Sequence, residues 1–318
     1  MISAFLVVDK PAGITSHDVV AMVRAVTGVK KVGHTGTLDP FATGVLALAL
    51  GAATRLISFV EEDLKVYDAT ISLGSATDTG DPTGQVIRTL PVPDLSADDI
   101  DAALKSFLGV VMQAPPRYSA VKVRGRPLYS YAREGKDVTA APRPTRIDKV
   151  ELLDRGPDWL RVFIECGKGT YARVLADEIA SALGTAGHLA ALRRSRSGPF
   201  LEADAMPLSA LSQLAGGSDD WNAVLRPSRG PERVRWASRE TVLAGLAPWM
   251  KSPMQVLSHM PVAFIGPADR TRVRGGGTPP APPSAVQVGQ QYLAVDGDEI
   301  VGIAVREPTG PRLVRLID

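Results

Sequence analysis

The segment from Gly33 to Pro40, with the sequence GHTGTLDP, holds the residue types best suited to chemistry in this chain of 318 residues. It packs two glycines, a histidine and a carboxylate into eight residues, ahead of the apolar run Val45–Leu50. Glycines allow tight backbone geometry or the close approach of a ligand, and Pro40 restricts Asp39 to an extended conformation. We therefore expect an ordered loop that presents Asp39 beside a core strand. A structural loop with an Asx turn at Asp39 fits the spacing equally well.

Other familiar catalytic patterns are missing from the sequence. The glycines are not followed by the Lys-Ser or Lys-Thr pair of a phosphate-binding loop, and there is no Gly-x-Ser-x-Gly elbow. Four histidines and one cysteine show no spacing typical of metal ligands. What remains is a site built on one carboxylate, for which we expect neither a metal nor a cofactor.

Two predicted elements flank the Asp39 loop in sequence. Residues 4–9 indicate a short buried strand, after which Ser16 is expected to cap a helix that ends at Thr27 and Gly28. Further along, the residues from Val66 to Leu73 alternate between apolar and polar, as in a strand with one buried face. Tyr67 belongs to the apolar set.

The segment Lys168–Arg173 (KGTYAR) is a second candidate for chemistry. It follows an alternating strand predicted at Trp159–Cys166 and opens a helix that Gly184 ends. The apolar stripe of that helix consists of Val174, Leu175, Ile179, Ala182 and Leu183. Tyr171 and Arg173 thus lie at a strand-to-helix junction, where a rigid scaffold often aims side chains at a site.

The distribution of charge indicates a partner better than its sum, since 36 basic residues nearly balance 34 acidic ones. Between Arg117 and Lys149 there are nine Lys or Arg against three acidic residues. Residues 188–200 add Arg193, Arg194 and Arg196 without an acidic residue. A solvated surface explains either run alone. Together, and interleaved with tyrosines, they favour a polyanion, because phosphates attract Lys and Arg and bases stack on aromatic rings.

Length and composition allow one large domain and a small one. The single cysteine, Cys166, excludes a disulfide framework and favours a reducing compartment. The first residues, MISAFLVV, offer no basic leader and no apolar run long enough for a signal or an anchor, and no stretch approaches the ~20 apolar residues of a membrane helix. We expect a soluble cytoplasmic protein.

Composition changes after about Leu214. Residues 215–252 are poorly periodic and contain three tryptophans, so we interpret them as a linker or an insertion that packs locally. Beyond a loop at Gly275–Pro280, three strands are predicted at Gln291–Asp296, Glu299–Arg306 and Arg312–Ile317, with a hairpin turn at Asp296–Gly297. The C-terminal part is therefore expected to be small and rich in β-structure.

Several segments resemble, in order, the motifs of the TruB family of tRNA pseudouridine-55 synthases. Gly33–Pro40 resembles the catalytic motif of that family. The other matching segments are Asp9–Ser16 (DKPAGITS), Tyr118–Lys122 (YSAVK) with Leu128–Gly135 (LYSYAREG), Lys168–Arg173 and His188–Arg194 (HLAALRR). The likeness covers about the first two thirds of the chain, and five ordered motifs argue against coincidence.

The resemblance implies a role for each matching residue. Asp39 would be the essential carboxylate, Arg173 would pair with it, and Tyr67 would stack on the target uracil. Further substrate contacts or support would come from Tyr171 and Leu192 in the pocket wall, His34 near the flipped nucleotide, and Lys10. Plainer interpretations exist, since Tyr67 and Leu192 also suit an ordinary core, Lys10 a surface, and His34 a loop histidine bonded to backbone.

The implied fold is α+β, a pseudouridine synthase catalytic domain with a mixed, largely antiparallel central sheet, followed by a small β-rich domain that is PUA-like and binds RNA. Residues 1–214 would form the catalytic domain, 215–252 the linker or insertion and 253–318 the small domain. The implied partner is the T arm of tRNA, bound by a monomer without a membrane, a metal or a cofactor.

The implied chemistry suits these residue types. Pseudouridine forms when the N-glycosidic bond breaks, the uracil turns over and C5 bonds to C1′ of the same ribose, so nothing is oxidised or hydrolysed. The carboxylate of Asp39 could attack C1′, attack C6 or remove a C2′ proton, and all three routes need its charged form. A nearby Arg173 would favour that form by lowering the pKa. The base must be flipped out, and an aromatic face such as Tyr67 replaces part of the lost stacking.

Three alternatives remain at this level. A guide-RNA-dependent relative of the same superfamily acts on ribosomal RNA, but this chain lacks the Lys-rich tails common in eukaryotic members of that branch. A catalytically idle protein that binds or folds tRNA is a second alternative, against which the intact Asp39, Tyr67 and Arg173 argue. A glycoside hydrolase is the third, and it usually needs two carboxylates that flank the bond.

Overall fold

The computed structural model describes residues 2–60, 64–216, 220–229 and 236–317. Its main feature is an eleven-stranded mixed sheet with the order β14-β1-β3-β12-β4-β11-β10-β7, to which β2, β13 and β15 add short pairings. The strands are β1 (Ser3–Lys10), β2 (Val32–His34), β3 (Thr43–Gly51), β4 (Lys65–Leu73), β7 (Gly109–Gln113), β10 (Arg143–Arg155), β11 (Trp159–Cys166), β12 (Gly187–Ser197), β13 (Phe200–Leu201), β14 (Met206–Pro207) and β15 (Met250–Lys251). Most neighbours are antiparallel, while β1–β14 and β3–β12 are parallel. The predicted α+β class with a mixed, largely antiparallel sheet is confirmed.

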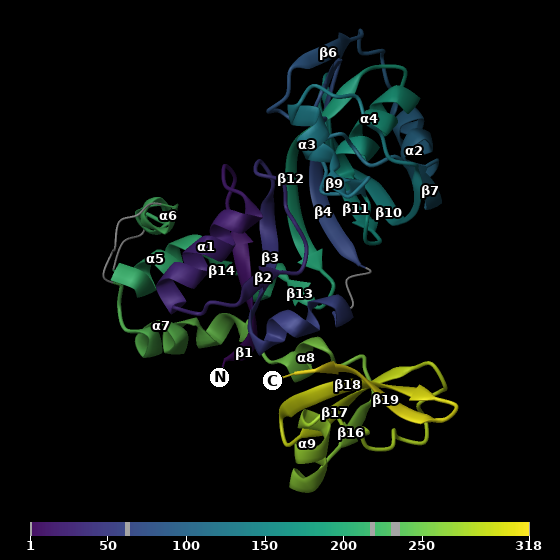
Figure 1. The fold of residues 1–318 in the computed structure, drawn as a ribbon. Coiled ribbons are helices and arrows are strands. Elements are labelled where there is room, and N and C mark those ends of the chain that lie inside the picture. Colours follow the sequence, from purple (N-terminus) through teal and green to yellow (C-terminus); the bar gives the residue numbers. More distant parts are fainter. Residues whose placement is uncertain (1, 61–63, 217–219, 230–235, 318) are drawn as a thin grey trace.

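Helices cover the two halves of this sheet separately (Figure 1). One group lies near β1 and β3, and the other lies near β10 and β11. The helices are α1 (Ser16–Thr27), α2 (Ala97–Lys105), α3 (Leu128–Arg133), α4 (Ala172–Ala182), α5 (Leu208–Gly216), α6 (Asn222–Arg229), α7 (Arg239–Leu246), α8 (Pro253–Val256), α9 (Pro267–Arg274) and the 3-10 helices η1 (Ala52–Phe59), η2 (Glu202–Asp204) and η3 (Ala247–Trp249). Two small hairpins lie in the half of the molecule that holds β10 and β11 (Figure 1). They are formed by β5 (Ser75–Thr77) with β6 (Val86–Thr89) and by β8 (Lys122–Val123) with β9 (Arg126–Pro127).

The centre of the sheet carries the residues on which a site can be built. Strand β12 runs between β3 and β4, so it joins the two halves of the molecule. Every second residue of β4 from Tyr67 to Leu73 is buried, as the alternation predicts. The α4 stripe is confirmed at Leu175, Ile179 and Leu183, whereas Val174 is partly buried and Ala182 is exposed, because the buried face is centred on Ala176, Ile179 and Ala180.

Helix α1 begins one residue away from the predicted cap. Thr15, and not Ser16, is the N-cap, and it forms a capping box with Asp18. The hydroxyl of Ser16 is used elsewhere, since Oγ donates to the carbonyl of Leu38 and accepts from its N–H. Gly28 ends the helix with φ of +64°, as expected from the sequence. The start of α1 is therefore tied to the loop that carries Asp39.

The segment Gly33–Pro40 is ordered, as predicted, but its first residues form a strand. Val32, Gly33 and His34 pair with β3 as strand β2, and the loop proper begins at Thr35. Three residues are too few for an alternating pattern, so periodicity does not predict this strand.

The C-terminal residues form the predicted β-rich unit. Its sheet has the order β16 (Val262–Phe264), β17 (Gln291–Asp296), β18 (Glu299–Glu307) and β19 (Gly310–Leu316). The three strands expected from the sequence are confirmed. Leu293, Val295 and Ile303 share one hydrophobic cluster with Phe5 and Val45, so this sheet packs on the back of β1 and β3.

The described parts of residues 215–252 are mostly short helices, and they pack against the first elements of the chain. Helices α6 and α7 contact α1, and β15 pairs with β1. Trp221, Trp236 and Trp249 are partly buried against the main core. The sequence pattern missed these helices because each spans only eight residues, too short for a clear period. Within the described chain, no helix has the length and apolar character needed to cross a bilayer.

Candidate active site

Asp39 and Arg173 form an ion pair although 134 positions separate them in the sequence. Nε of Arg173 lies 2.9 Å from Oδ2 of Asp39, and Nη2 donates to Oδ1 at 3.3 Å. The arginine side chain is 7% exposed and the aspartate side chain 33% exposed. The pair therefore joins a buried guanidinium to a carboxylate with one open side. Two-point contact fixes the orientation of the carboxylate as well as its position.

The remaining donors of Arg173 hold it in place from the other side. Nη1 donates to the carbonyl of Thr79 at 2.8 Å, and Nη2 also donates to the carbonyl of Tyr118 at 2.9 Å. Gly80 packs directly against Arg173 with φ of +72°, and a Cβ there would lie 3.3 Å from Cβ of Arg173. The guanidinium is thus preorganised, and the loop at Thr79–Gly80 leaves little room for it to move.

Burial governs the pKa of Asp39. Desolvation raises the pKa above its ordinary value of 3.8, the charge of Arg173 lowers it, and nearby Asp81 raises it again. The expectation that Arg173 lowers the pKa is confirmed, but burial outweighs this effect and the net direction is upward. The reason is that a carboxylate loses more hydration on burial than one guanidinium returns.

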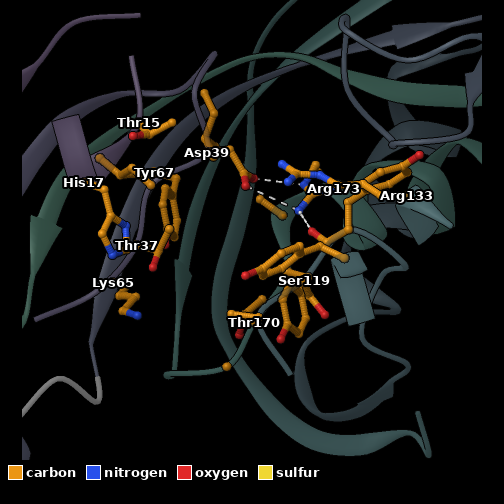
Figure 2. A pocket seen from close by; sticks show the side chains of 18 residues that line it. Thr15, His17, Thr37, Asp39, Lys65, Tyr67, Ser119, Arg133, Thr170 and Arg173 are labelled. Atoms are coloured by element: carbon orange, nitrogen blue, oxygen red, sulfur yellow. Dashed lines mark hydrogen bonds and ion pairs between the residues drawn. The ribbon is translucent and has the colours of Figure 1, made fainter. Parts of the chain in front are cut away.

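A cavity of about 650 Å³ opens beside this ion pair. In Figure 2, Asp39 lies between a group that includes His17 and Tyr67 and a group that includes Arg173, Ser119 and Thr170. The lining comprises Thr15, His17, Thr37, Leu38, Asp39, Lys65, Tyr67, Tyr118, Ser119, Ala120, Tyr129, Arg133, Gly169, Thr170, Tyr171, Ala172, Arg173 and Leu192. Five of the seven residues singled out from the sequence are therefore brought together here, namely Asp39, Tyr67, Tyr171, Arg173 and Leu192.

Lys10 and His34, the other two, lie outside the cavity lining. Nζ of Lys10 is buried and donates to the carbonyls of Pro11, Ile14 and Pro40, and burial lowers its pKa to about 8. Lys10 thus braces the residue that follows Asp39 and is neither a surface lysine nor a wall of the cavity.

His34 lies one layer behind the cavity. Its ring meets the ring of His17 edge-on, with centroids 5.4 Å apart, and His17 lines the cavity instead. Burial, followed by the charges of His17 and Arg194, lowers the pKa of His34, so the ring is neutral at pH 7. Sequence reasoning missed His17, although its place one residue after Ser16 in a matching motif was a usable signal.

The two basic runs, residues 117–149 and 188–200, differ in how far their cations are exposed and bonded. Arg194 is buried and bonds carbonyl oxygens, Arg193 pairs with Asp9 and Glu202, and Arg196 bonds the carbonyl of Gly198. Of these three arginines, Arg194 is therefore closed to a polyanion and Arg193 is engaged in ion pairs, while Arg196 is exposed. Alternation along β12 was the missed signal, because Leu192 and Arg194 are two residues apart and share one face.

The run from Arg117 to Lys149 keeps its positive excess. Arg117, Arg126, Lys136, Arg146 and Lys149 form exposed ion pairs with Asp137, Glu134, Asp148 and Glu151. Within the described chain, the structure gives no ion pair to Lys122, Arg124 and Arg143, and places Arg133 over the ring of Tyr129. These four cations are exposed, so this run remains a candidate surface for a polyanion.

The described residues contain no group of three or more His, Cys, Asp or Glu placed to bind a metal ion. The side chains that line the cavity offer one oriented carboxylate, four tyrosine rings and apolar walls. A carboxylate of this kind can act as a nucleophile or as a base.

Comparison with protein families accounts for this combination. Residues 24–172 match the family described as "TruB family pseudouridylate synthase (N terminal domain)", and residues 173–228 match "tRNA pseudouridylate synthase B C-terminal domain". The chain belongs to the TruB family. The resemblance inferred from the motifs is thereby confirmed, and the chain is a pseudouridine synthase.

Individual TruB relatives agree along most of the chain. "tRNA pseudouridine synthase B" of Ruegeria pomeroyi is 47% identical over 229 residues, which cover 71% of this chain and 74% of the relative. The protein of that name from Gluconacetobacter diazotrophicus is 49% identical over 208 residues, covering 65% and 68%. The one from Geotalea uraniireducens is 39% identical over 275 residues, covering 86% and 80%.

Solved structures extend the likeness in fold to nearly the whole TruB chain. A chain of a Cbf5-Nop10-Gar1 complex matches with a TM-score of 0.66 and 25% identity, covering 99% of this chain and 83% of that chain. A chain of an archaeal box H/ACA sRNP Nop10-Cbf5 complex matches with a TM-score of 0.68 at 22% identity, which supports the fold alone.

Proposed function

We propose that this enzyme isomerises a uridine of tRNA to pseudouridine, with Asp39 as the essential carboxylate. The observation that carries the proposal is the two-point ion pair between Asp39 and Arg173 beside an open cavity, in a TruB chain. Names of the relatives support tRNA as the substrate. The family resemblance further supports position 55 in the T arm as the target.

Five side chains of the cavity lining have a role in this proposed reaction. The target base enters by flipping out of its stack, and the ring of Tyr67 replaces part of the stacking it loses. Leu192 and Tyr171 exclude water while the uracil is detached. Asp39, held by Arg173, attacks C1′ or C6 or removes a C2′ proton. The N1–C1′ bond then breaks, the C5–C1′ bond forms, C5 loses its proton and N1 carries one, so the reaction balances without an added reagent.

His34 and Lys10 act on the reaction indirectly, because neither lines the cavity. His34 acts on the RNA through His17, whose ring it packs against. Lys10 supports the backbone next to Asp39 and makes no substrate contact.

We retain the division of the chain into 1–214, 215–252 and 253–318 as part of the proposal, with a PUA-like, RNA-binding role for the last part. Arginines support that role only partly. Arg270, Arg272 and Arg312 pair with acids, and Arg306 bonds carbonyls, whereas Arg315 is exposed without an ion pair in the described chain. We also propose a cytoplasmic monomer, in keeping with a tRNA substrate and a single buried thiol.

A guide-RNA-dependent reaction is the competing function, favoured by the fold shared with chains of the Cbf5 complexes. Relatives named for tRNA match at 39–49% identity, well above the 22–25% of those chains. An idle tRNA-binding protein is the remaining alternative. Both can be tested directly.

The purified protein should convert a uridine of an unmodified tRNA transcript without guide RNA, cofactor or added metal beyond that which folds the tRNA. Pseudouridine is mapped by carbodiimide labelling and primer extension, with a transcript that carries cytidine at position 55 as control. Conversion at another position would refute the T-arm assignment alone. No conversion, or conversion only with a guide RNA, would refute the proposal.

A further inference from the structure

Arg194 is one of the largest side chains that the fold buries completely, with 1% of it exposed. Its guanidinium donates to three backbone carbonyls. Nε bonds Val45 at 2.8 Å, Nη1 bonds Thr37 at 3.3 Å and Nη2 bonds Gly36 at 3.1 Å. A buried charge is costly unless it is well bonded. Its place in the fold therefore needs a reason.

Strand pairing sets Arg194 between the two parts of the site. In β12 it lies opposite Tyr67 of β4 and opposite Gly44 of β3. A Cβ at Gly44 would lie 2.2 Å from the carbonyl oxygen of Arg194, and Gly44 has φ of +101°, so only glycine lets β3 approach so closely. Leu192, two residues earlier on β12, lines the cavity, whereas Arg194 is buried outside the lining.

The guanidinium of Arg194 acts on both the loop that carries Asp39 and the ring of Tyr67. It bonds the two residues that begin the turn toward Asp39. Its charge also opposes the effect of burial on Tyr67, lowering a pKa that desolvation raises. One residue is thus paired with Tyr67 across two strands and hydrogen-bonded to the loop of Asp39.

We propose that Arg194 is a positioning residue of the reaction. It fixes the Asp39 loop against the strand that carries Tyr67, so that the carboxylate and the stacking ring keep their relative placement when RNA enters. This inference rests on the proposed function of the same site.

The loop itself has almost no backbone freedom left. Each carbonyl from Gly36 to Pro40 accepts a hydrogen bond: two come from Arg194, one from Ser16, one from the N–H of Ala42, and the last from Gly13 and Lys10. The planar guanidinium of Arg194 reaches the carbonyls of two successive residues in the loop and that of a third residue on β3. The single ammonium group of a lysine cannot reach all three. Displacement of a reactive group by ~1 Å can cost ~100-fold in rate.

The variant Arg194→Lys tests the proposal, with Arg196→Lys as its control. Arg196 lies on the same strand and is exposed, and among the described residues its side chain donates to the nearby carbonyl of Gly198. Single-turnover rates at saturating tRNA and dissociation constants would be measured well below the melting temperature of each protein. We expect Arg194→Lys to lower the rate about tenfold or more, with tRNA affinity within about threefold of wild type. Arg196→Lys should change neither.

A core arginine that merely stabilises the fold would lower the melting temperature and leave the rate of the folded enzyme unchanged. A rate within about threefold of wild type therefore overturns the proposal. A loss of affinity that accounts for the whole defect also overturns it, because Arg194 would then act on binding. If the wild type itself makes no pseudouridine, the proposed function fails and this inference fails with it, whereas an active wild type with an unaffected Arg194→Lys overturns this inference alone.

Ser16→Ala keeps the proposal testable if Arg194→Lys does not fold. It removes a smaller anchor of the same loop, the hydroxyl that bonds the N–H and the carbonyl of Leu38. The same pattern is expected, a slower chemical step with unchanged affinity. An unchanged rate in folded Ser16→Ala would show that anchoring of this loop does not limit catalysis, and the proposal would fall.

Discussion

The cavity has two walls, and they are built differently. The inner wall, formed by Asp39, Tyr67, Arg173 and Leu192, belongs to the central sheet and to the elements bonded to it. Arg173, Tyr67 and Leu192 are each 7% exposed or less. The outer wall, formed by Tyr118, Tyr129 and Arg133, belongs to the short hairpin and helix that follow β7, and Tyr129 is 41% exposed.

The walls also differ in what holds their charges. On the inner wall, buried donors and acceptors are bonded on several sides, which fixes their geometry and makes any substitution costly. On the outer wall, Arg133 lies 5.3 Å above the ring of Tyr129, and neighbouring cations form exposed ion pairs worth little. The comparison indicates that the inner wall serves the chemical step and the outer wall serves RNA binding.

The largest effect is expected from Asp39→Asn. The amide keeps the shape but loses the reactive charge, so the single-turnover rate should fall by about a thousandfold or more. Affinity for tRNA, measured by filter binding, should stay within about threefold of wild type. Turnover within tenfold of wild type would show that Asp39 does not take part in the reaction. The proposal that the inner wall serves the chemical step would then fail.

Arg173→Lys should have the next largest effect. Lysine keeps the charge but loses the two-point contact with Asp39 and at least one of the carbonyl contacts, so turnover should fall about 10- to 100-fold. Rapid-quench single-turnover assays, together with a separate measurement of tRNA affinity, test this expected loss of turnover. Normal turnover with weakened binding would identify Arg173 as a phosphate contact and contradict its place in the inner wall.

The acid side of the pH profile follows from the raised pKa of Asp39. Only the ionised form is reactive, so the rate should fall about tenfold per pH unit below that pKa, at a higher pH than an ordinary carboxylate would give. Asp81→Asn removes a charge that raises the pKa and should move the fall to lower pH. A profile that stays flat down to pH 4, with the tRNA still folded, would show that burial does not control this carboxyl group.

On the outer wall, Arg133→Gln should act on binding alone. We expect tRNA affinity to fall about three- to tenfold and the salt dependence of log affinity to lose about one unit of slope, with turnover at saturation unchanged. Lys105→Gln is a matched control, since Lys105 is an exposed cation on α2 outside the cavity lining. A defect in turnover that persists at saturating tRNA would place Arg133 with the inner wall.

The smallest effect is expected from Arg315→Gln in the C-terminal sheet. Point substitution is preferable to truncation, because that sheet covers Phe5 and Val45 and its removal would expose them. Affinity should fall by about twofold and turnover should not change. If affinity and salt slope both equal those of wild type, the RNA-binding role proposed for residues 253–318 loses its support from this residue.

Periodicity and local motifs determined the longer elements of this protein. Alternation from Val66 to Leu73 places Tyr67 on the buried face, and Gly28 ends α1. The strands of the C-terminal sheet and the family itself also followed from short-range patterns. These features depend on residues a few positions apart, so a linear sequence contains all the information they require.

Tertiary structure alone decided what the charged residues do. Arg193 and Arg194 are adjacent and identical in type, yet one forms exposed ion pairs and the other is buried against carbonyls of a distant loop. The direction of the Asp39 pKa and the hidden place of His34 were likewise decided by burial. Desolvation and hydrogen bonding depend on which strands become neighbours, here β12 between β3 and β4, and that neighbourhood exists only in the folded chain.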